Sequence, residues 1–219
     1  MISLAALAIV VESFLLGSIP WRVVISHLVK HDDVRTHGSG NIGTTNMIRA
    51  YGKKLGYICF VLDFAKAALA CALVYPICDF ALATGSVDPV FVESRILLIT
   101  AGMFAILGHI FSPWLGFKGG KGVACGGGVS LVAFGWPQFL ILLAVFIVFV
   151  VATKAVSAGS IAAAAVFPFL GVWVYWGNTV GILMSIAIGA VVIWSHRSNI
   201  ERLAHGTENK IGSKKTADE

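Results

Sequence analysis

Long apolar stretches, separated by shorter polar segments, run along almost the whole sequence. They lie at about residues 4–28, 55–78, 96–113, 121–136, 137–153, 156–175 and 178–196. About 20 apolar residues cross a bilayer as a helix, and a helix satisfies its own backbone polar groups in lipid. A transmembrane barrel would alternate apolar and polar positions, and these stretches do not. The pattern predicts an all-α, polytopic membrane helix bundle with about seven transmembrane helices.

The fourth and fifth stretches are short, and only Gly135, Trp136 and Pro137 separate them. Glycine and proline both interrupt regular helices. Residues 121–153 therefore form either two short spans or one kinked or re-entrant element, and the sequence leaves both alternatives open.

The amino-acid composition is typical of a membrane protein. Of the 219 residues, 58% are hydrophobic and 12% are charged, whereas soluble domains carry about 25% charged residues. We expect residues 1–219 to form one integral membrane domain, with a cytoplasmic tail at about 197–219. The first apolar stretch lacks the preceding basic residues of a cleaved signal peptide, so we interpret residues 4–28 as a span.

Basic residues are distributed unequally between the two sides of the predicted bundle. When the loops are assigned alternately to the two sides, thirteen lysines and arginines lie on one side and only Arg95 lies on the other. Cytoplasmic loops carry an excess of basic residues, so we expect the N-terminus outside and the C-terminus in the cytoplasm. This orientation explains the net charge of +5, with membrane lipids and no nucleic acid as partners.

Four charged residues, Glu12, Arg22, Asp63 and Lys66, fall within or near the apolar stretches. Such residues are costly in lipid and usually face the protein interior or a polar cavity. Asp63 and Lys66 are three positions apart, so they can pair on one helix face. We expect either a structural ion pair or side chains that line a site.

The first polar segment, residues 33–49, is rich in glycine and hydroxyl groups. Successive backbone N–H groups in such a segment can cradle an oxyanion. A helix that begins near Thr44 would place Thr45 and Arg49 on one face, and its N-terminus would attract an anion. A flexible loop with a helix cap is the alternative. The candidate ligands are Gly38, Ser39, Gly40, Gly43, Thr44, Thr45, Asn46 and Arg49.

The second polar segment, residues 108–123, contains a lysine between glycines at 119–122. It is not a Walker motif, because it lacks the early glycine and has Gly122 where that motif has serine or threonine. ATP binding is therefore not inferred. Lys121 can still meet a phosphate as a mobile point charge at a helix start, whereas anchoring at the membrane surface better explains Lys118.

The third polar segment, residues 196–210, follows the last apolar stretch. His196 and Asn199 are three positions apart, so a helix would align them on one face. A solvated basic tail is the alternative. His109, at the end of the third apolar stretch, is either a helix C-terminal cap or a site residue. The six histidines show no zinc-site spacing, so no metal is expected.

Together, these segments resemble the bacterial acyl-phosphate:glycerol-3-phosphate acyltransferase family. The matching residues are 17–20, 37–46 with Arg49, 108–109, 117–123, 196–200, 202–203 and 206–210. One lysine between glycines is weak evidence, but all these stretches in the family's order are highly specific. Trp21, Arg22 and Cys125 differ from the residues that are usual in the family, and we expect them to affect helix packing or the acyl groove.

The resemblance implies a seven-helix enzyme of the bacterial inner membrane with its active site at the cytoplasmic face. It implies transfer of an acyl group from acyl phosphate to the 1-hydroxyl of glycerol 3-phosphate, which gives lysophosphatidate in the first step of phospholipid synthesis. The residues that match the glycerol 3-phosphate site are Ser39, Arg49, Lys121, His196 and Asn199. Those that match the acyl-phosphate site are Gly40, Asn41, Gly43, Thr45, Asn46, Gly119, Gly120 and Gly122. No cofactor is implied, and we expect a monomer.

The expected chemistry suits these residues. An acyl phosphate is a mixed anhydride with a good leaving group, so neither a metal nor a covalent acyl-enzyme is needed. Ser39, Lys121 and His196 are the candidate catalytic residues. The hydroxyl proton goes either to the donor's phosphate, as the resemblance suggests, or to His196 as a general base. His27 and Asp32 have the spacing of another acyltransferase class, but nothing else of that class is apparent.

Two other protein classes are compatible with parts of this pattern. An anion transporter or channel also combines glycine-broken spans with basic residues, but the chain has no convincing internal repeat, and its glycine loops lie at the predicted membrane edge. A non-catalytic subunit of a lipid pathway is the third class. Formation of lysophosphatidate by purified protein would separate the three, whereas acyl-chain preference does not follow from the sequence.

Overall fold

The computed structural model describes residues 4–37, 43–85 and 95–211, and this part of the chain contains helices and no strands. The helices are α1 (Leu4–Ser18), α2 (Trp21–Lys30), α3 (Thr44–Tyr51), α4 (Lys53–Ala72), α5 (Val74–Ala83), α7 (Ile96–Ile110), α8 (Val123–Val129), α9 (Trp136–Thr153), α10 (Val156–Val174), α11 (Thr179–Ser195) and α12 (Arg197–Ala204). The shorter elements are the 3-10 helices η1 (Val34–Thr36) and η2 (Pro113–Leu115) and the π-helical turn η3 (Ser130–Phe134). The expected all-α class is confirmed for these residues.

Five helical stretches in the described part of the chain are long and apolar enough to cross a membrane. They are residues 4–30, 53–83, 96–115, 136–153 and 156–174. The count rises to six if α11 and α12, which are bent by 58°, form one span.

Two of the seven expected spans correspond to shorter elements in the structure. The stretch expected at 121–136 is a helix of residues 123–134, and at 1.5 Å per residue it is only about 18 Å long. The stretch expected at 178–196 is α11, which has 17 residues. A bilayer core is about 30 Å thick, so these two elements account for the difference between seven spans and five.

Proline and glycine explain where two of the expected elements are interrupted. Pro20 separates α1 from α2, because proline has no N–H and disfavours a helical conformation in the residue before it. Gly135 has a φ of 107° and ends η3, and α9 begins at Trp136 with Pro137 in its first turn. Residues 121–153 therefore form two separate helical elements, of which only α9 reaches spanning length.

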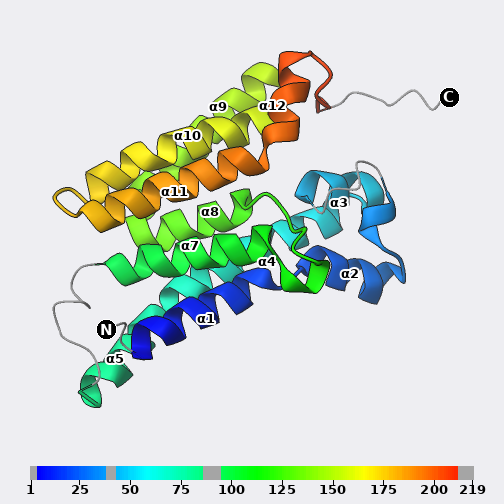
Figure 1. Cartoon of the computed structure of the whole chain (residues 1–219). Coiled ribbons are helices and arrows are strands. Elements are labelled where there is room, and N and C mark those ends of the chain that lie inside the picture. Colours follow the sequence, from blue (N-terminus) through cyan, green and yellow to red (C-terminus); the bar gives the residue numbers. More distant parts are fainter. Residues whose placement is uncertain (1–3, 38–42, 86–94, 212–219) are drawn as a thin grey trace, which may run out of the picture.

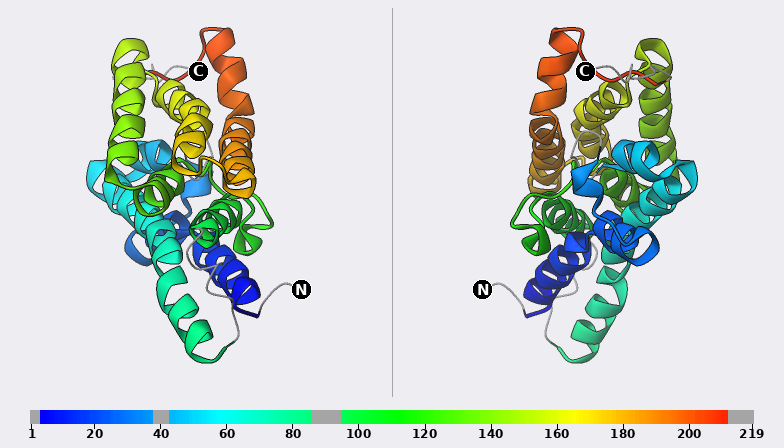
Figure 2. Two further views of the ribbon diagram at one scale, coloured as in Figure 1. Left: turned by 90° about the vertical axis from the view of Figure 1, so that its left-hand side faces the viewer. Right: turned by 90° about the vertical axis from the view of Figure 1, so that its right-hand side faces the viewer.

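Helix α7 lies at the centre of the bundle and packs against α1, α4, α8 and α11 (Figures 1 and 2). Its contact with α1 is especially close at Gly17 and Gly108, where an added Cβ would overlap the backbone of the opposite helix. Small residues of this kind let helices pack tightly in lipid, where packing rather than water exclusion drives association. Helix α9 contrasts with α7, because Leu142 is its only buried residue.

The polar segments gather at one end of the bundle (Figure 1). Helices α2, α3 and α12 and the loop before α8 lie at this end, whereas α5 and the start of α1 lie at the other. The packing of apolar helices thus brings together polar residues that are far apart in the sequence.

Candidate functional site

Lys121 and Asn199 meet between the loop before α8 and the first turn of α12. The Lys121 Nζ donates a hydrogen bond to the Asn199 Oδ1. The loop is also fixed through its backbone, because the Ser195 Oγ donates to the Lys121 carbonyl oxygen at 3.0 Å. Two residues that the sequence placed in different polar segments therefore contact each other directly.

His196 lies at the bend between α11 and α12 and is buried. Its Nδ1 donates to the Val192 carbonyl oxygen at 2.8 Å. Because a carbonyl can only accept, this contact places the imidazole proton on Nδ1 and leaves Nε2 as an acceptor in the neutral ring. The expected helical alignment of His196 with Asn199 is modified by the 58° bend, although the Asn199 N–H still bonds to the His196 carbonyl oxygen at 2.8 Å.

Glu208 fixes the orientation of the Asn199 amide. The Asn199 Nδ2 lies 3.1 and 3.2 Å from the two Glu208 carboxylate oxygens, so Oδ1 is left to accept from Lys121. The Arg202 Nε also donates to Glu208, at 2.9 Å. The Ile211 N–H then bonds to the Lys154 carbonyl oxygen at 2.7 Å, which fastens the segment after α12 to the α9–α10 connection.

Lys121 lies outside the candidate spans, but it is partly enclosed by protein. Burial lowers the pKa of Lys121 to about 8, and the positive charge of Arg202 contributes in the same direction. The lowered pKa means that the surroundings of Lys121 disfavour its positive charge. The negative charge of an anionic ligand would compensate for this and stabilise the charged lysine.

Helix α3 begins at Thr44 with Gly43 as its N-cap, so the predicted helix start is confirmed. Thr45 and Arg49 therefore lie one turn apart. Arg49 is exposed, and it has no hydrogen bond or ion pair within the described residues. The candidate ligands Ser39, Gly40 and Asn41 lie outside the described residues.

Asn46 has contacts that the sequence did not predict. Its side chain is buried, and Nδ2 donates to the carbonyl oxygens of Val34 and His37 at 3.2 and 3.0 Å. The amide therefore joins α3 to the segment around η1. This is a structural contact in addition to any contact with a substrate.

The glycines before Lys121 serve close packing. The N–H groups of Gly119 and Gly120 donate to the carbonyl oxygens of Ile110 and His109 at 2.8 and 3.0 Å, so neither N–H is left for a phosphate. A Cβ on Gly120 would overlap the His109 ring. Gly122 has a φ of 82° and precedes α8, and the first N–H groups of that helix have no intrahelical acceptors. Of the three glycines that match the acyl-phosphate site in this loop, Gly122 is therefore the one that lies beside such N–H groups.

A buried ion cluster lies beside this loop. The Asp63 carboxylate lies 2.6 Å from the Arg22 Nη2 and 2.9 Å from the Lys66 Nζ. The His109 Nδ1 lies 3.6 Å from the same carboxylate. Lys66 also donates to the Ile19 carbonyl oxygen at 2.7 Å, where α1 gives way to α2. The predicted pairing of Asp63 with Lys66 is confirmed.

The ion cluster contacts both glycine-containing segments, the one at residues 33–49 and the one at residues 108–123. The Arg22 Nη2 donates to the Thr44 Oγ1 at 3.3 Å, and the cavity around Arg22 is lined by Lys66, His109 and Gly120. The sequence indicated Arg22 as a charged residue within or near an apolar stretch, and it left His109 as either a helix C-terminal cap or a site residue. Arg22 and His109 lie between the two segments because of which helices pack together. The spacing of residues along the sequence does not show which helices are neighbours.

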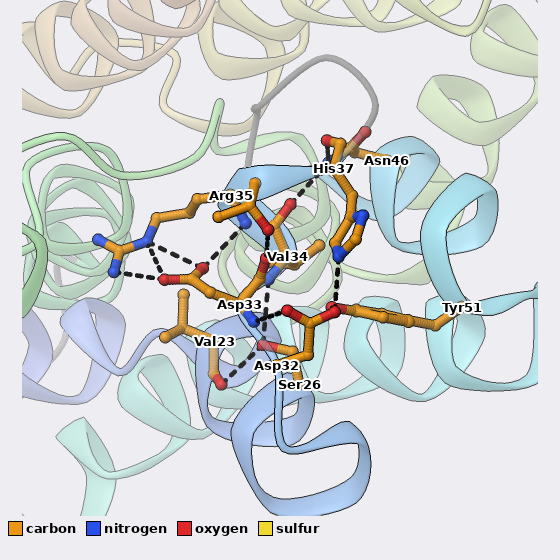
Figure 3. A network of polar contacts seen from close by, with 10 residues as sticks. Val23, Ser26, Asp32, Asp33, Val34, Arg35, His37, Asn46 and Tyr51 are labelled. Carbon is orange, nitrogen blue, oxygen red and sulfur yellow. Dashed lines mark hydrogen bonds and ion pairs between the residues drawn. The ribbon is translucent and has the colours of Figure 1, made fainter.

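Asp32 does not pair with His27 as the alternative acyltransferase spacing would require. Its Oδ2 instead accepts from the His37 Nε2 at 2.6 Å and from the Tyr51 hydroxyl at 3.0 Å (Figure 3). These hydrogen bonds, that from His37 most strongly, hold the pKa of Asp32 below its usual value. The carboxylate is therefore ionised near neutral pH.

Comparison with known proteins agrees with this arrangement. A family model described as glycerol-3-phosphate acyltransferase matches residues 7–206. The glycerol-3-phosphate acyltransferase of Maricaulis maris is 37% identical over 213 residues, which cover 97% of this chain and 90% of that protein. The corresponding protein of Parasynechococcus marenigrum is 38% identical over 211 residues, with coverage of 96% and 92%.

Two solved structures are also similar. The crystal structure of PlsY (YgiH), an integral membrane glycerol 3-phosphate acyltransferase, in its glycerol 3-phosphate form has a TM-score of 0.77 and 36% identity. The similarity covers 94% of this chain and 96% of that one. The lysophosphatidic acid form has a TM-score of 0.75. Because the family model and these relatives match nearly the whole sequence, the chain belongs to the glycerol-3-phosphate acyltransferase family, whose members act in phospholipid biosynthesis.

Proposed function

We propose that this membrane protein transfers an acyl group from acyl phosphate to the 1-hydroxyl of glycerol 3-phosphate, giving lysophosphatidate and inorganic phosphate. The observation that carries the proposal is the contact between Lys121 and Asn199, with His196 buried at the adjoining bend. Family membership and the glycerol 3-phosphate and lysophosphatidic acid forms of the similar structure support the acceptor and the product.

The acceptor is held by Ser39, Arg49, Lys121, His196 and Asn199. Exposed Arg49 offers a planar guanidinium for bidentate phosphate contacts, and partly enclosed Lys121 offers a point charge. Glu208 keeps the Asn199 amide in one orientation, so the site is organised before a ligand enters. Such pre-organisation lowers the entropic cost of bringing two reactants together.

The acyl-phosphate site is formed by Gly40, Asn41, Gly43, Thr45, Asn46, Gly119, Gly120 and Gly122. Gly43 and Thr45 lie at the N-terminus of α3, and Gly122 caps α8. Helix N-termini present N–H groups without intrahelical acceptors and therefore favour anions. Gly119 and Gly120 contribute by letting the loop approach His109 closely, because their own N–H groups are already bonded.

The reaction requires no covalent acyl-enzyme. The acceptor hydroxyl oxygen forms a new ester bond with the acyl carbon, and the bond from that carbon to the phosphate oxygen breaks. The hydroxyl proton leaves with the donor's phosphate or passes to the His196 Nε2, which is the acceptor nitrogen of the neutral ring. Lys121 and Ser39 lower the energy of the transition state through contacts with the negatively charged oxygens.

An assay with purified protein tests the proposal. Glycerol 3-phosphate and palmitoyl phosphate are expected to give lysophosphatidate and one phosphate per product, because phosphate is the leaving group. Palmitoyl-CoA serves as the matched donor and is expected to give no product. Formation of lysophosphatidate with palmitoyl-CoA but not with palmitoyl phosphate would refute the donor assignment. Detection of an acylated protein by intact mass spectrometry during turnover would refute direct transfer.

We also propose seven spans, with the N-terminus outside and the site at the cytoplasmic face of a bacterial inner membrane. The unequal distribution of basic residues supports this orientation. The four native cysteines are buried, so single cysteines introduced at exposed Thr84 and Lys210 can be compared in intact cells. A membrane-impermeant thiol reagent is expected to label the Thr84→Cys variant only. If only the Lys210→Cys variant were labelled, the protein would have the opposite orientation in the membrane.

A further inference from the structure

The carboxylate of Asp32 joins segments that are separated along the chain (Figure 3). Its Oδ2 accepts from the His37 Nε2 at 2.6 Å and from the Tyr51 hydroxyl at 3.0 Å. Its Oδ1 accepts from the Asp33 N–H at 2.7 Å. His37 follows η1, whereas Tyr51 is the last residue of α3. One side chain thus connects the start of the polar segment to its end.

A second set of contacts joins the same two parts of the chain. Asn46 of α3 donates to the carbonyl oxygens of Val34 and His37. The Val34 side chain is fully buried and packs in a small apolar cluster with Met47 of α3. The Asp32 and Asn46 contacts lie near opposite ends of α3, so together they fix its rotation as well as its position.

Helix α3 is held on two sides, because it packs against α4, where an added Cβ on Gly56 would overlap the Ile48 side chain, and its Asp32 and Asn46 contacts join it to residues 32–37. It has eight residues, and an isolated helix of that length is unstable in water. Gly52, with a φ of 87° and no atom within 4 Å of an added Cβ, separates it from α4. The junction is therefore a break rather than a continuous helix. The contacts of α3 with α4 and with residues 32–37 therefore determine together how α3 presents Thr45 and Arg49.

We propose that Asp32 is a positioning residue that locks α3, and with it Arg49, against residues 33–37 through Tyr51 and His37. The inference rests on the proposed function, in which Arg49 holds glycerol 3-phosphate. The bond from Tyr51 persists over the whole working range, because burial and the Asp32 carboxylate raise the pKa of the phenol to about 12. Asp32 itself does not touch the substrate.

Removing only the Tyr51 hydroxyl gives the first test. The Tyr51→Phe variant is expected to raise KM for glycerol 3-phosphate roughly threefold to tenfold, the range that one lost hydrogen bond produces, with kcat within about twofold of wild type. The unfolding midpoint is expected to fall by no more than about 2–4 °C. Tyr57→Phe, which removes a hydroxyl from an exposed residue of α4, is the control and is expected to match wild type.

A double-mutant cycle then tests whether Tyr51 acts through Asp32. Asp32→Ala is expected to raise the same KM, and adding Tyr51→Phe to that variant is expected to have no further effect. Additive effects would contradict the route through Asp32. Wild-type KM values in both single variants would overturn the inference while leaving the proposed reaction intact.

Hydrogen exchange tests the inference without any enzymatic readout. Amide exchange in residues 44–51 is expected to be faster in the Asp32→Ala variant than in wild type, with exchange in α7 unchanged. Equal exchange in α3 would overturn the positioning role even if wild-type protein formed no lysophosphatidate. Failure of the proposed reaction and failure of this inference are therefore distinguishable.

Discussion

Replacing Lys121 by methionine is expected to lower kcat/KM for glycerol 3-phosphate by about 10²- to 10³-fold, the loss typical of removing one stabilising donor from an active site. Methionine keeps the length and the apolar stem of the side chain but removes the charge that contacts Asn199. Steady-state kinetics of purified variants measure this effect. Lys118→Met is the matched control, because Lys118 is exposed on the same loop, and wild-type kinetics are expected for it.

The pH dependence of the same rate constant checks that the charge of Lys121 is responsible. The pKa of Lys121 is lowered to about 8, so the side chain is charged below this pH and loses its proton above it. Wild-type kcat/KM is therefore expected to fall as pH rises through about 8. Arginine stays charged throughout this range, so a decline of the same size and midpoint in Lys121→Arg would contradict the assignment.

Replacing Asp63 by asparagine is expected to lower the free energy of unfolding by about 3–5 kcal/mol, as when one partner of a buried ion pair is removed. Asparagine preserves the shape of the side chain but leaves the positive charges of Arg22 and Lys66 without their buried counter-ion. The cost is large because lipid and the apolar core cannot solvate them. Unfolding in mixed micelles measures the effect.

Asp79→Asn provides the comparison for that experiment. Asp79 is exposed on α5, so the same chemical change there is expected to leave stability nearly unchanged. An equal stability of the Asp63→Asn and Asp79→Asn variants would show that the ion cluster does not hold the helices together.

Several features of this structure follow from local sequence, and these were predictable. The start of α3 follows from glycine and threonine at positions 43 and 44, and the Asp63–Lys66 pair follows from helical spacing. Apolar run lengths predicted the membrane class. They also predicted the elements at 123–134 and 179–195 to within two residues at each end, and both elements are shorter than the bilayer core is thick.

Other features depend on which elements become neighbours in space. His27 and Asp32 have the spacing of another acyltransferase class, but the structure joins Asp32 to His37 and Tyr51. The resemblance placed Gly119 and Gly120 at the acyl-phosphate site, but the end of α7 supplies acceptors for the N–H groups of both. Sequence spacing reports contacts within one element, whereas these contacts cross between elements.

The contact between Asn199 and Glu208 has a consequence for how the protein is made. Lys121 leaves the ribosome long before Asn199, Glu208 or the segment that bonds to Lys154. During synthesis, most of the apolar helices enter the membrane while the polar end of the bundle is still incomplete. Because domains assemble as their parts emerge, the nascent chain acquires its membrane anchorage first and its organised lysine–asparagine contact last.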